Sequence, residues 1–165
     1  MAYLLDANVF ISAKNLHYGM DFCPAFWEWL LNAHDKGIVF SIEKVSDELA
    51  SGQDELVAWA QNLPKGFFLS PDAEAIPALG KIASWIQAHA TYSVAAKSLF
   101  LQIADYYLVA QALAGSYVVV THEQPQNSIN RNLIPNVCLG CGVKYINPFE
   151  MLRREQARFV LGRLP

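Results

Sequence analysis

The chain has 165 residues and a mass of 18.4 kDa, the usual size of one folded domain with its own hydrophobic core. Hydrophobic residues make up 53% of it and charged residues 16%, a balance that excludes disordered and fibrous proteins. A net charge of −3 gives no general attraction for nucleic acid or anionic membranes, so a polyanionic partner needs a local basic patch or bound cations. We therefore expect a single domain over residues 1–165.

The sequence favours a cytoplasmic protein. Its 3 cysteines are an odd number, unlike the dense, even sets of small secreted domains. A carboxylate already stands at Asp6, and no basic region followed by an apolar run precedes it, so we expect no signal peptide. The apolar stretch 101–120 contains Asp105 and is interrupted at Gly115, which favours a buried helix followed by a strand and no membrane segment.

In the first part of the chain, a strand is followed by a helix twice. The short apolar run at 3–5 ends in polar residues, which is typical of a strand buried on both faces. An amphipathic helix is predicted to begin near Pro24 and to end before Gly37. A second strand is predicted over 38–40, with Ser41 as the N-cap of the next helix.

The rest of the chain repeats these patterns. Helical spacing of apolar residues is followed by short β-branched or aromatic runs. Helices are predicted over 56–60, 72–89, 93–101 and 151–161, and strands over 67–69, 117–121 and 143–146.

Alternating strands and helices predict parallel strands joined by right-handed helical crossovers. The expected fold class is therefore α/β, a three-layer α/β/α sandwich with a central, mainly parallel sheet. In such sheets, ligands bind outside the carboxyl ends of the strands. Residues directly after the apolar runs are consequently the first candidates for a functional site.

Four acidic residues are candidates for this edge: Asp6, Glu48, Asp105 and Glu123. We expect all four at strand-to-helix junctions. Asp6, with Asn8 two residues later, follows the first strand, although an Asp in this place often only caps the next helix. Asp105 lies in an apolar helical stretch, where a buried carboxylate needs a partner or a cation unless it caps the helix.

Clustered carboxylates repel one another unless divalent cations neutralise them, and oxygen ligands alone favour Mg²⁺ or Mn²⁺. Two such cations can activate a water against a phosphodiester and stabilise the leaving oxygen, which is nuclease chemistry. Asp47 competes with Glu48 for the ligand position, because a shift of one residue turns a helical side chain by roughly 100°. We choose Glu48.

The ordered motifs around these acids resemble those of PIN-domain ribonucleases. The resemblance spans about residues 3–149 and is strongest to a bacterial subgroup related to the VapC-type toxins of toxin–antitoxin pairs. It is carried by Leu4-Leu5-Asp6-Ala7-Asn8-Val9-Phe10, Val45-Ser46-Asp47-Glu48-Leu49, Ala104-Asp105 with Leu108-Val109-Ala110-Gln111-Ala112, and Val118-Val119-Val120-Thr121-His122-Glu123. The subgroup opens with Asp-Ala-Asn-x-Phe-Ile-Ser-Ala-Lys-Asn, which matches residues 6–15 here.

This resemblance implies a Mg²⁺- or Mn²⁺-dependent endoribonuclease that cuts RNA, is often a homodimer and is inhibited by a cognate antitoxin protein. Asp6, Glu48 and Asp105 match the three metal-binding acids of that family. Asn8 and Thr121 match the polar residues that orient the site. Glu123 departs from the Asp or Asn that is commoner at its position, so it could reach the metal directly or through water.

Several basic residues are candidates for contacts with phosphate. These are Lys14, Lys44, Arg131, His122 and the arginines of the final helix, Arg153, Arg154, Arg158 and Arg163. The arginines could instead form a solvated face or an antitoxin contact, and His122 could be solvent-exposed. Cys138 and Cys141 have the spacing of a zinc or redox pair but no second pair, so small apolar residues near a turn are the simpler interpretation. The alternative to the enzyme is a catalytically silent PIN-fold module that binds a protein or RNA partner.

Overall fold

Within residues 1–131 and 133–162, the part of the chain that the computed structural model describes, five short strands form one sheet. Every neighbouring pair of strands runs parallel, which confirms the predicted parallel sheet. The order across the sheet is β3-β2-β1-β4-β5. The strands are β1 (Tyr3–Leu5), β2 (Val39–Ile42), β3 (Phe68–Leu69), β4 (Val118–Val120) and β5 (Tyr145–Ile146).

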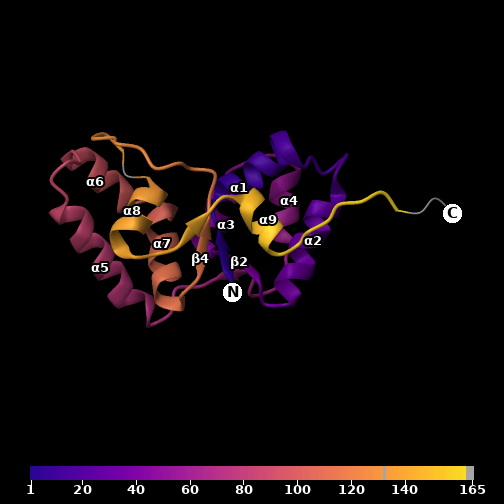
Figure 1. Cartoon of the computed structure of the whole chain (residues 1–165), viewed down its shortest axis with the longest axis horizontal. Coiled ribbons are helices and arrows are strands. Elements are labelled where there is room, and N and C mark those ends of the chain that lie inside the picture. Colours follow the sequence, from indigo (N-terminus) through magenta and orange to yellow (C-terminus); the bar gives the residue numbers. More distant parts are fainter. Residues whose placement is uncertain (132, 163–165) are drawn as a thin grey trace.

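Helices cover both faces of this sheet. Figure 1 shows α5 to α8 on one side and α1, α2, α4 and α9 on the other, so the three-layer sandwich is confirmed. The helices are α1 (Ala7–Ser12), a π-helical turn (Ala13–His17), α2 (Pro24–Asp35), α3 (Glu43–Ala50), α4 (Glu55–Gln61), α5 (Ala75–Ala88), α6 (Val94–Phe100), α7 (Ala104–Gly115), α8 (Ile134–Cys141) and α9 (Pro148–Arg154).

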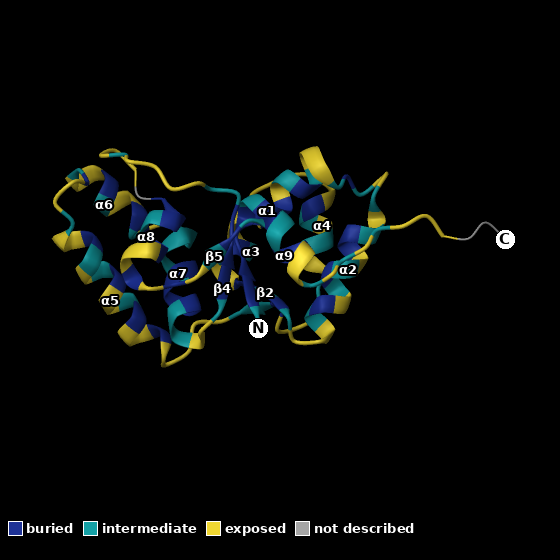
Figure 2. Ribbon diagram, in the orientation of Figure 1, coloured by how far each residue is buried: buried dark blue, intermediate teal, exposed yellow. Residues whose placement is uncertain are grey.

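The strands form because their residues are apolar on both faces. All residues of β1 and β4 are buried, as expected for parallel strands that helices cover on both sides. Figure 2 shows the sheet buried at the centre, while the helices expose only their outer faces. The core therefore holds the carboxyl ends of β1 and β4 in fixed positions.

Two helix ends show how local sequence sets the layout. Pro24 stands in the first turn of α2, and Gly37 beyond its end has a φ of +71°, a left-handed conformation that glycine adopts without strain. Both predictions are confirmed. Ser116 ends α7 with a φ of 57°, which turns the chain directly into β4.

Ser41 is not the N-cap that the sequence predicts. It lies inside β2, which continues to Ile42, and Ile42 takes the N-cap position of α3. The Ser41 hydroxyl donates a 2.6 Å hydrogen bond to the carbonyl oxygen of Leu5 on the neighbouring strand. This contact with β1 satisfies the buried hydroxyl and keeps Ser41 in the sheet.

The predicted final helix over 151–161 is also corrected. Helix α9 ends at Arg154, because Gln156 adopts a left-handed φ of 53° and the Ala157 amide donates to the Leu152 carbonyl, which closes the helix end. The chain then continues extended, and Phe159 packs against Tyr18. Arg163 lies outside the described residues.

The apolar stretch at 101–120 folds as predicted, into the buried helix α7 followed by β4. Across the described residues, none of the helices combines the length and the apolar character needed to cross a membrane.

Candidate active site

The site begins where β1 and β4 end side by side. Leu5 pairs with Val120 in the parallel register, and the Asp6 amide donates to the Val120 carbonyl at 3.0 Å. Asp6 and Thr121, the next residues of the two segments, are therefore brought together at the carboxyl edge of the sheet. This is the edge at which ligands bind in parallel α/β folds.

Asp6 is buried, with 5% of its surface exposed, and its carboxylate is held by one hydroxyl. Thr121, which is fully buried, donates a 2.8 Å hydrogen bond from Oγ1 to Asp6 Oδ2. Asp6 occupies the N-cap position of α1, but its side chain accepts no capping hydrogen bond. The carboxylate is consequently directed toward the site and is not used to cap the helix.

Asn8 supports the same contact from the first turn of α1. Its Nδ2 donates to Thr121 Oγ1 at 3.0 Å, and its Oδ1 accepts a 3.1 Å hydrogen bond from the His122 amide. Thr121 Oγ1 also accepts from the Glu123 amide at 3.1 Å. The orienting roles expected of Asn8 and Thr121 thus have a structural counterpart, because both fix Asp6 relative to the segment after β4.

Asp105 reaches this edge by a different route from the one predicted. It does not follow a strand, because α6 precedes α7 in the chain, so the expected strand-to-helix junction is wrong at this position. Helix α7 leads into the start of β4, and its first turn, which holds Asp105, therefore lies at the opposite edge, where the strands end. The N-cap position of α7 is Ile103, and Asp105 stands in the first turn, where its own backbone amide donates a hydrogen bond to its carboxylate.

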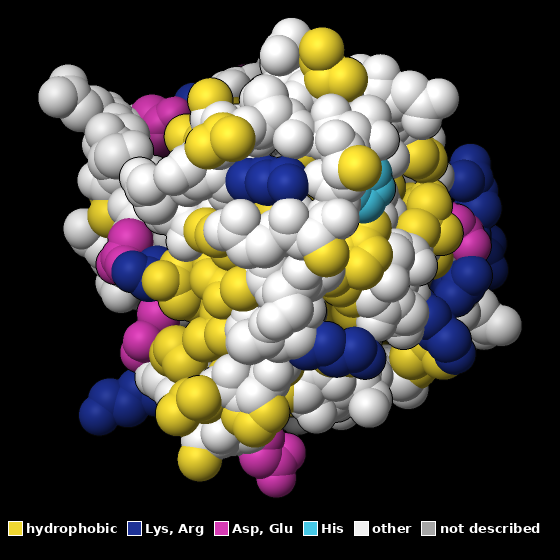
Figure 3. Space-filling view, turned by 90° about the vertical axis from the view of Figure 1, so that its left-hand side faces the viewer, with side chains coloured by type: hydrophobic (Ala, Val, Ile, Leu, Met, Phe, Trp, Pro, Cys, Tyr) yellow, Lys and Arg dark blue, Asp and Glu magenta, His cyan; other side chains and the backbone are white. Residues whose placement is uncertain are grey.

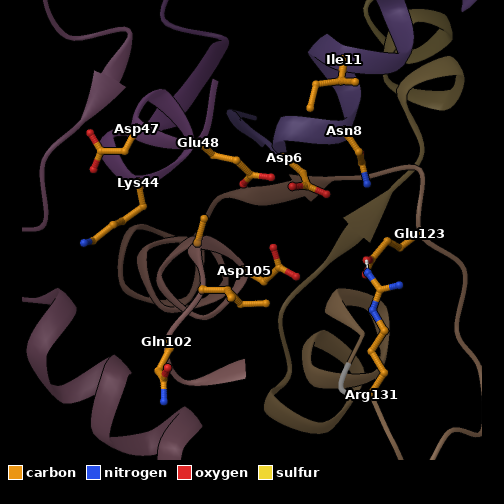
Figure 4. Close-up of a pocket in the computed structure, with 12 residues that line it drawn as sticks. Asp6, Asn8, Ile11, Lys44, Asp47, Glu48, Gln102, Asp105, Glu123 and Arg131 are labelled. Atoms are coloured by element: carbon orange, nitrogen blue, oxygen red, sulfur yellow. Dashed lines mark hydrogen bonds and ion pairs between the residues drawn. The ribbon is translucent and has the colours of Figure 1, made fainter. Parts of the chain in front are cut away.

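Glu48 completes the group from the middle of α3, the helix that follows β2. Figure 4 shows the carboxylates of Asp6, Glu48 and Asp105 turned toward one another, whereas Asp47 points away from Asp6. Both Asp47 and Glu48 line the cavity, but the orientation favours Glu48.

The acids line a cavity of about 520 Å³ that lies between α1, α3 and α7. Its charged lining residues are Asp6, Lys44, Asp47, Glu48, Asp105, Glu123 and Arg131. Lys44 and Arg131 stand on opposite sides of the acidic centre (Figure 4). Lys44 also lies over the ring of Tyr107, with Nζ 5.1 Å from its centroid.

The electrostatics of the cavity favour protonated carboxyls when no cation is bound. Burial raises the pKa of Asp6 to about 8, and the negative charge of Asp105 adds to this effect against the Thr121 hydrogen bond, which lowers it. Burial also raises the pKa of Asp105 to about 7, with Glu123 and Glu48 adding to it. The pKa of Glu48 is raised by burial as well. A cation placed among these groups would relieve both causes.

Glu123 faces the cavity, but its two oxygens already have protein partners. Oε1 accepts from Arg131 Nη2 at 2.9 Å, and Oε2 accepts from the Ile134 amide at 2.9 Å. The second contact satisfies a free N–H in the first turn of α8. Glu123 thus links the segment after β4 to α8, and direct ligation of a metal would require it to give up one of these contacts.

Two predicted site residues are not brought to the acidic centre. Lys14 Nζ lies 2.6 Å from Oδ2 of the exposed Asp54, and Lys14 does not line the cavity. The His122 ring packs against His17 and Phe149, with ring centroids 5.4 and 5.6 Å apart, and burial lowers its pKa. Its backbone amide, not its ring, contacts Asn8.

Gln102 and Ile103 line the same cavity, although no motif in the sequence indicates them. They belong to the turn that leads into α7. Their position just before Asp105 could have indicated them, because the residues that lead into the first turn of α7 lie at the same edge of the sheet.

The sequence matches the family described as "Domain of unknown function (DUF4411)" over residues 3–159. This match covers nearly the whole chain. The chain belongs to the DUF4411 family. No curated protein and no solved structure matches it.

The donor set of this DUF4411 chain suits a hard divalent cation, because Asp6, Glu48 and Asp105 offer only oxygen atoms. As the side chains stand, no group of three or more His, Cys, Asp or Glu in residues 1–131 and 133–162 is arranged to hold a metal ion. The raised pKa values of Asp6 and Asp105 describe the same carboxyls without a cation between them.

The cysteine pair of this DUF4411 chain lies in the last turns of α8, directly before the left-handed Gly142 that ends the helix. Cys138 and Cys141 are both free and buried in the core, and burial raises the pKa of both thiols. A thiol with a raised pKa is mostly protonated at neutral pH, and the thiolate is the form that binds zinc. Their surroundings favour small apolar core residues, the simpler of the two interpretations.

Proposed function

We propose that this chain is a divalent-metal-dependent endoribonuclease that hydrolyses RNA phosphodiesters. The observation that carries the proposal is the meeting of Asp6, Glu48 and Asp105, from three separate segments, in one cavity at the carboxyl edge of the sheet. The resemblance of these segments to the motifs of PIN-domain ribonucleases supports it.

Asp6, Glu48 and Asp105 are the residues that would hold Mg²⁺ or Mn²⁺. When bound, such a cation lowers the pKa of a water and stabilises the leaving oxygen of a phosphodiester. Thr121 and Asn8 fix the Asp6 carboxylate through the hydrogen bonds described above, so the oxygen donors are oriented before the substrate arrives.

Two positively charged side chains at the cavity, Lys44 and Arg131, would attract the RNA backbone. The cavity itself is acidic and the whole chain carries a net charge of −3, so a polyanion is attracted only locally. Lys44 and Arg131 lie on opposite sides of the acids and would contact the phosphates on either side of the one that is cut.

We further propose that the chain is the toxin of a toxin–antitoxin pair in the cytoplasm. The resemblance to VapC-type toxins supports this, and the three free cysteines suit a reducing compartment. A cognate antitoxin or a second copy of the chain would find an apolar surface on the face shown in Figure 3, where hydrophobic side chains gather. The exposed large apolar residues of α5, α6 and α8 are Ile76, Val94, Leu99 and Leu139.

A catalytically silent binding module is the second candidate. Both Glu123 oxygens accept hydrogen bonds from Arg131 and Ile134. This favours the binding module, because Glu123, an expected metal ligand, then stabilises the fold and does not bind a cation. Such a module would bind RNA or a protein partner through the same cavity without cleaving it.

The proposal is tested by incubating the purified chain with total RNA in Mn²⁺ and sequencing the fragment ends. We expect discrete cuts that disappear with EDTA and in Asp6→Asn, Glu48→Gln and Asp105→Asn. Asp47→Asn is the matched control, because Asp47 lines the cavity but points away from Asp6. RNA binding without cuts under all conditions would favour the binding module.

A further inference from the structure

A second cavity lies beside the acidic one. It has a volume of about 310 Å³, close to the lower limit of roughly 300 Å³ for small-molecule sites. The two cavities share Glu123 and Arg131 as lining residues, so the Glu123–Arg131 ion pair forms the wall between them. A ligand that extends from the acidic centre past this ion pair would enter the second cavity.

The chemistry of the second cavity differs from that of the first. Gln124, Gln126 and Ser128 contribute amide and hydroxyl groups, beside His122 and Leu133. Gln124 and Gln126 are exposed, and their side chains have no hydrogen-bond partner within the described residues. An amide presents one donor and one acceptor in a plane, which is the pattern that reads the edge of a nucleobase.

The loop that carries these groups is held at three points. Asn136 of α8 accepts a 3.1 Å hydrogen bond from the Gln126 amide and donates one of 3.1 Å to the Gln126 carbonyl. The Ser93 amide at the start of α6 donates to the Ile129 carbonyl at 2.8 Å. Glu123 anchors the loop to α8 through Ile134. The cavity is therefore formed in advance, which lowers the entropic cost of binding.

The Arg131 guanidinium in the shared wall is exposed and can bind a phosphate. The Arg131 side chain is 66% exposed, while its partner Glu123 is 14% exposed. Among the described residues, the Arg131 guanidinium donates one hydrogen bond, to Glu123, so N–H donors remain on its exposed side. A guanidinium binds phosphate oxygens with two parallel hydrogen bonds. A phosphate bound to Arg131 would connect the nucleotide whose phosphate lies at the acidic centre to the nucleotide whose base lies in the second cavity.

We infer that the cavity formed by Gln124, Gln126 and Ser128 binds the nucleobase of the second nucleotide from the cut phosphate of a single-stranded RNA and sets the sequence preference of cleavage. This inference rests on the proposed endoribonuclease function. The amides hydrogen-bond the edge of an unstacked base, Arg131 contacts the intervening phosphate, and the acidic centre takes the phosphodiester that is cut. Recognition of splayed, single-stranded bases is the usual mode of sequence-specific RNA binding.

The first test is cleavage of a random-sequence RNA pool in Mn²⁺ by the full chain and by Gln124→Ala and Gln126→Ala, with the fragment ends sequenced. We expect a base preference at one fixed distance from the cut, of roughly 5- to 100-fold. It should fall toward equal use of the four bases in both variants. Gln61 is exposed at the end of α4, so Gln61→Ala is the matched control and should keep the base preference. If both loop variants keep the wild-type preference while cleavage continues, the inference is overturned and the proposed function stands.

The second test does not depend on cleavage. Fluorescence anisotropy measures the binding of labelled oligo-A, oligo-U and oligo-C octaribonucleotides to Asp6→Asn, with and without Gln126→Ala. We expect Asp6→Asn to bind one of the three best and to lose that difference when Gln126→Ala is added. Equal binding of all three by Asp6→Asn itself would overturn base recognition, whether or not the wild type cuts RNA. Because both glutamines are exposed, a comparison of melting temperatures verifies that the variants are folded.

Discussion

The Thr121 hydroxyl donates a 2.8 Å hydrogen bond to Oδ2 of Asp6, which joins the ends of the two central strands β1 and β4. The Thr121 hydroxyl oxygen, Oγ1, also accepts hydrogen bonds from Asn8 Nδ2 and from the Glu123 amide. One buried hydroxyl thereby orients the first acid of the site and the segment that carries the last one. The site and the sheet are consequently built by the same contacts.

Thr121→Val should harm both stability and cleavage. Valine keeps the shape of the side chain, but Asn8 Nδ2 and the Glu123 amide lose their acceptor, which costs about 2 kcal/mol in the free energy of unfolding. Urea unfolding measures this cost, and the rate of RNA cleavage should fall with it. Thr121→Ser retains the hydroxyl and serves as the control. Equal stability of the valine variant and the wild type would contradict the role given to this hydroxyl.

Stability without divalent cations should fall as the pH rises from about 4 to about 8. Asp6 has a folded-state pKa of about 8 and Asp105 one of about 7, both above the ordinary value of 3.8. The folded chain therefore binds more protons than the unfolded chain in this range, so the free energy of unfolding decreases with pH. Thermal unfolding in EDTA at pH 5, 7 and 9 measures the trend.

Asp6→Asn tests the origin of this pH dependence. An amide carries no charge, so the variant should be more stable than the wild type at pH 8 in EDTA, by an amount on the order of 2 kcal/mol. The difference should disappear near pH 4, where the carboxyl of the wild type is protonated. A wild type that is stabilised by rising pH in EDTA would show that the buried carboxyls are not raised in pKa.

Glu123→Gln should weaken Mn²⁺ binding less than Asp6→Asn or Asp105→Asn does. Both Glu123 oxygens are held by Arg131 and Ile134, and the glutamine carbonyl can still accept from the Ile134 amide. The ion pair with the exposed Arg131 contributes about 0.5 kcal/mol to stability. Calorimetric titration of Mn²⁺ into the three variants ranks them. An equal loss of affinity in all three would make Glu123 a direct ligand, one of the two alternatives that the sequence leaves open.

Lys14 and Lys44 should differ in their effect on RNA binding. Lys44 lines the acidic cavity, whereas Lys14 is paired with Asp54 outside it. Lys44→Ala should weaken RNA binding and lower the slope of log Kd against log salt concentration by about 0.7, the value for one phosphate contact on a single strand. Lys14→Ala should change neither quantity. The reverse order of effects would contradict an RNA path over the acidic cavity.

The sheet could be predicted from sequence because its strands are apolar on both faces. Tyr3–Leu5 and Val118–Val120 leave no polar residue inside the run, and the polar residue that follows each one marks the edge of the sheet. The positions of Asp6 and Thr121 follow from the same pattern. Their hydrogen bond then follows from the parallel register, which brings Leu5 beside Val120.

Features that depend on contacts between residues in separate segments could not be predicted from the sequence. Ser41 stays in β2 because its hydroxyl bonds to Leu5 on another strand, although its residue type favours a helix N-cap. Glu123 turns to Arg131 and Ile134 because the loop between them folds back onto α8. The sequence pattern selects such residues but does not reveal their partners.

The most direct test of the proposed cation site is calorimetric titration of Mn²⁺ at pH 7 in two buffers with different ionisation enthalpies, which yields the number of protons released. Asp6 and Asp105 are both partly protonated at this pH, so we predict that binding releases about one proton or more and that Asp6→Asn and Asp105→Asn each reduce both the affinity and the release. Mn²⁺ binding that is absent from the wild type, or that is unchanged in both variants, would contradict the assignment of these carboxylates to a metal site.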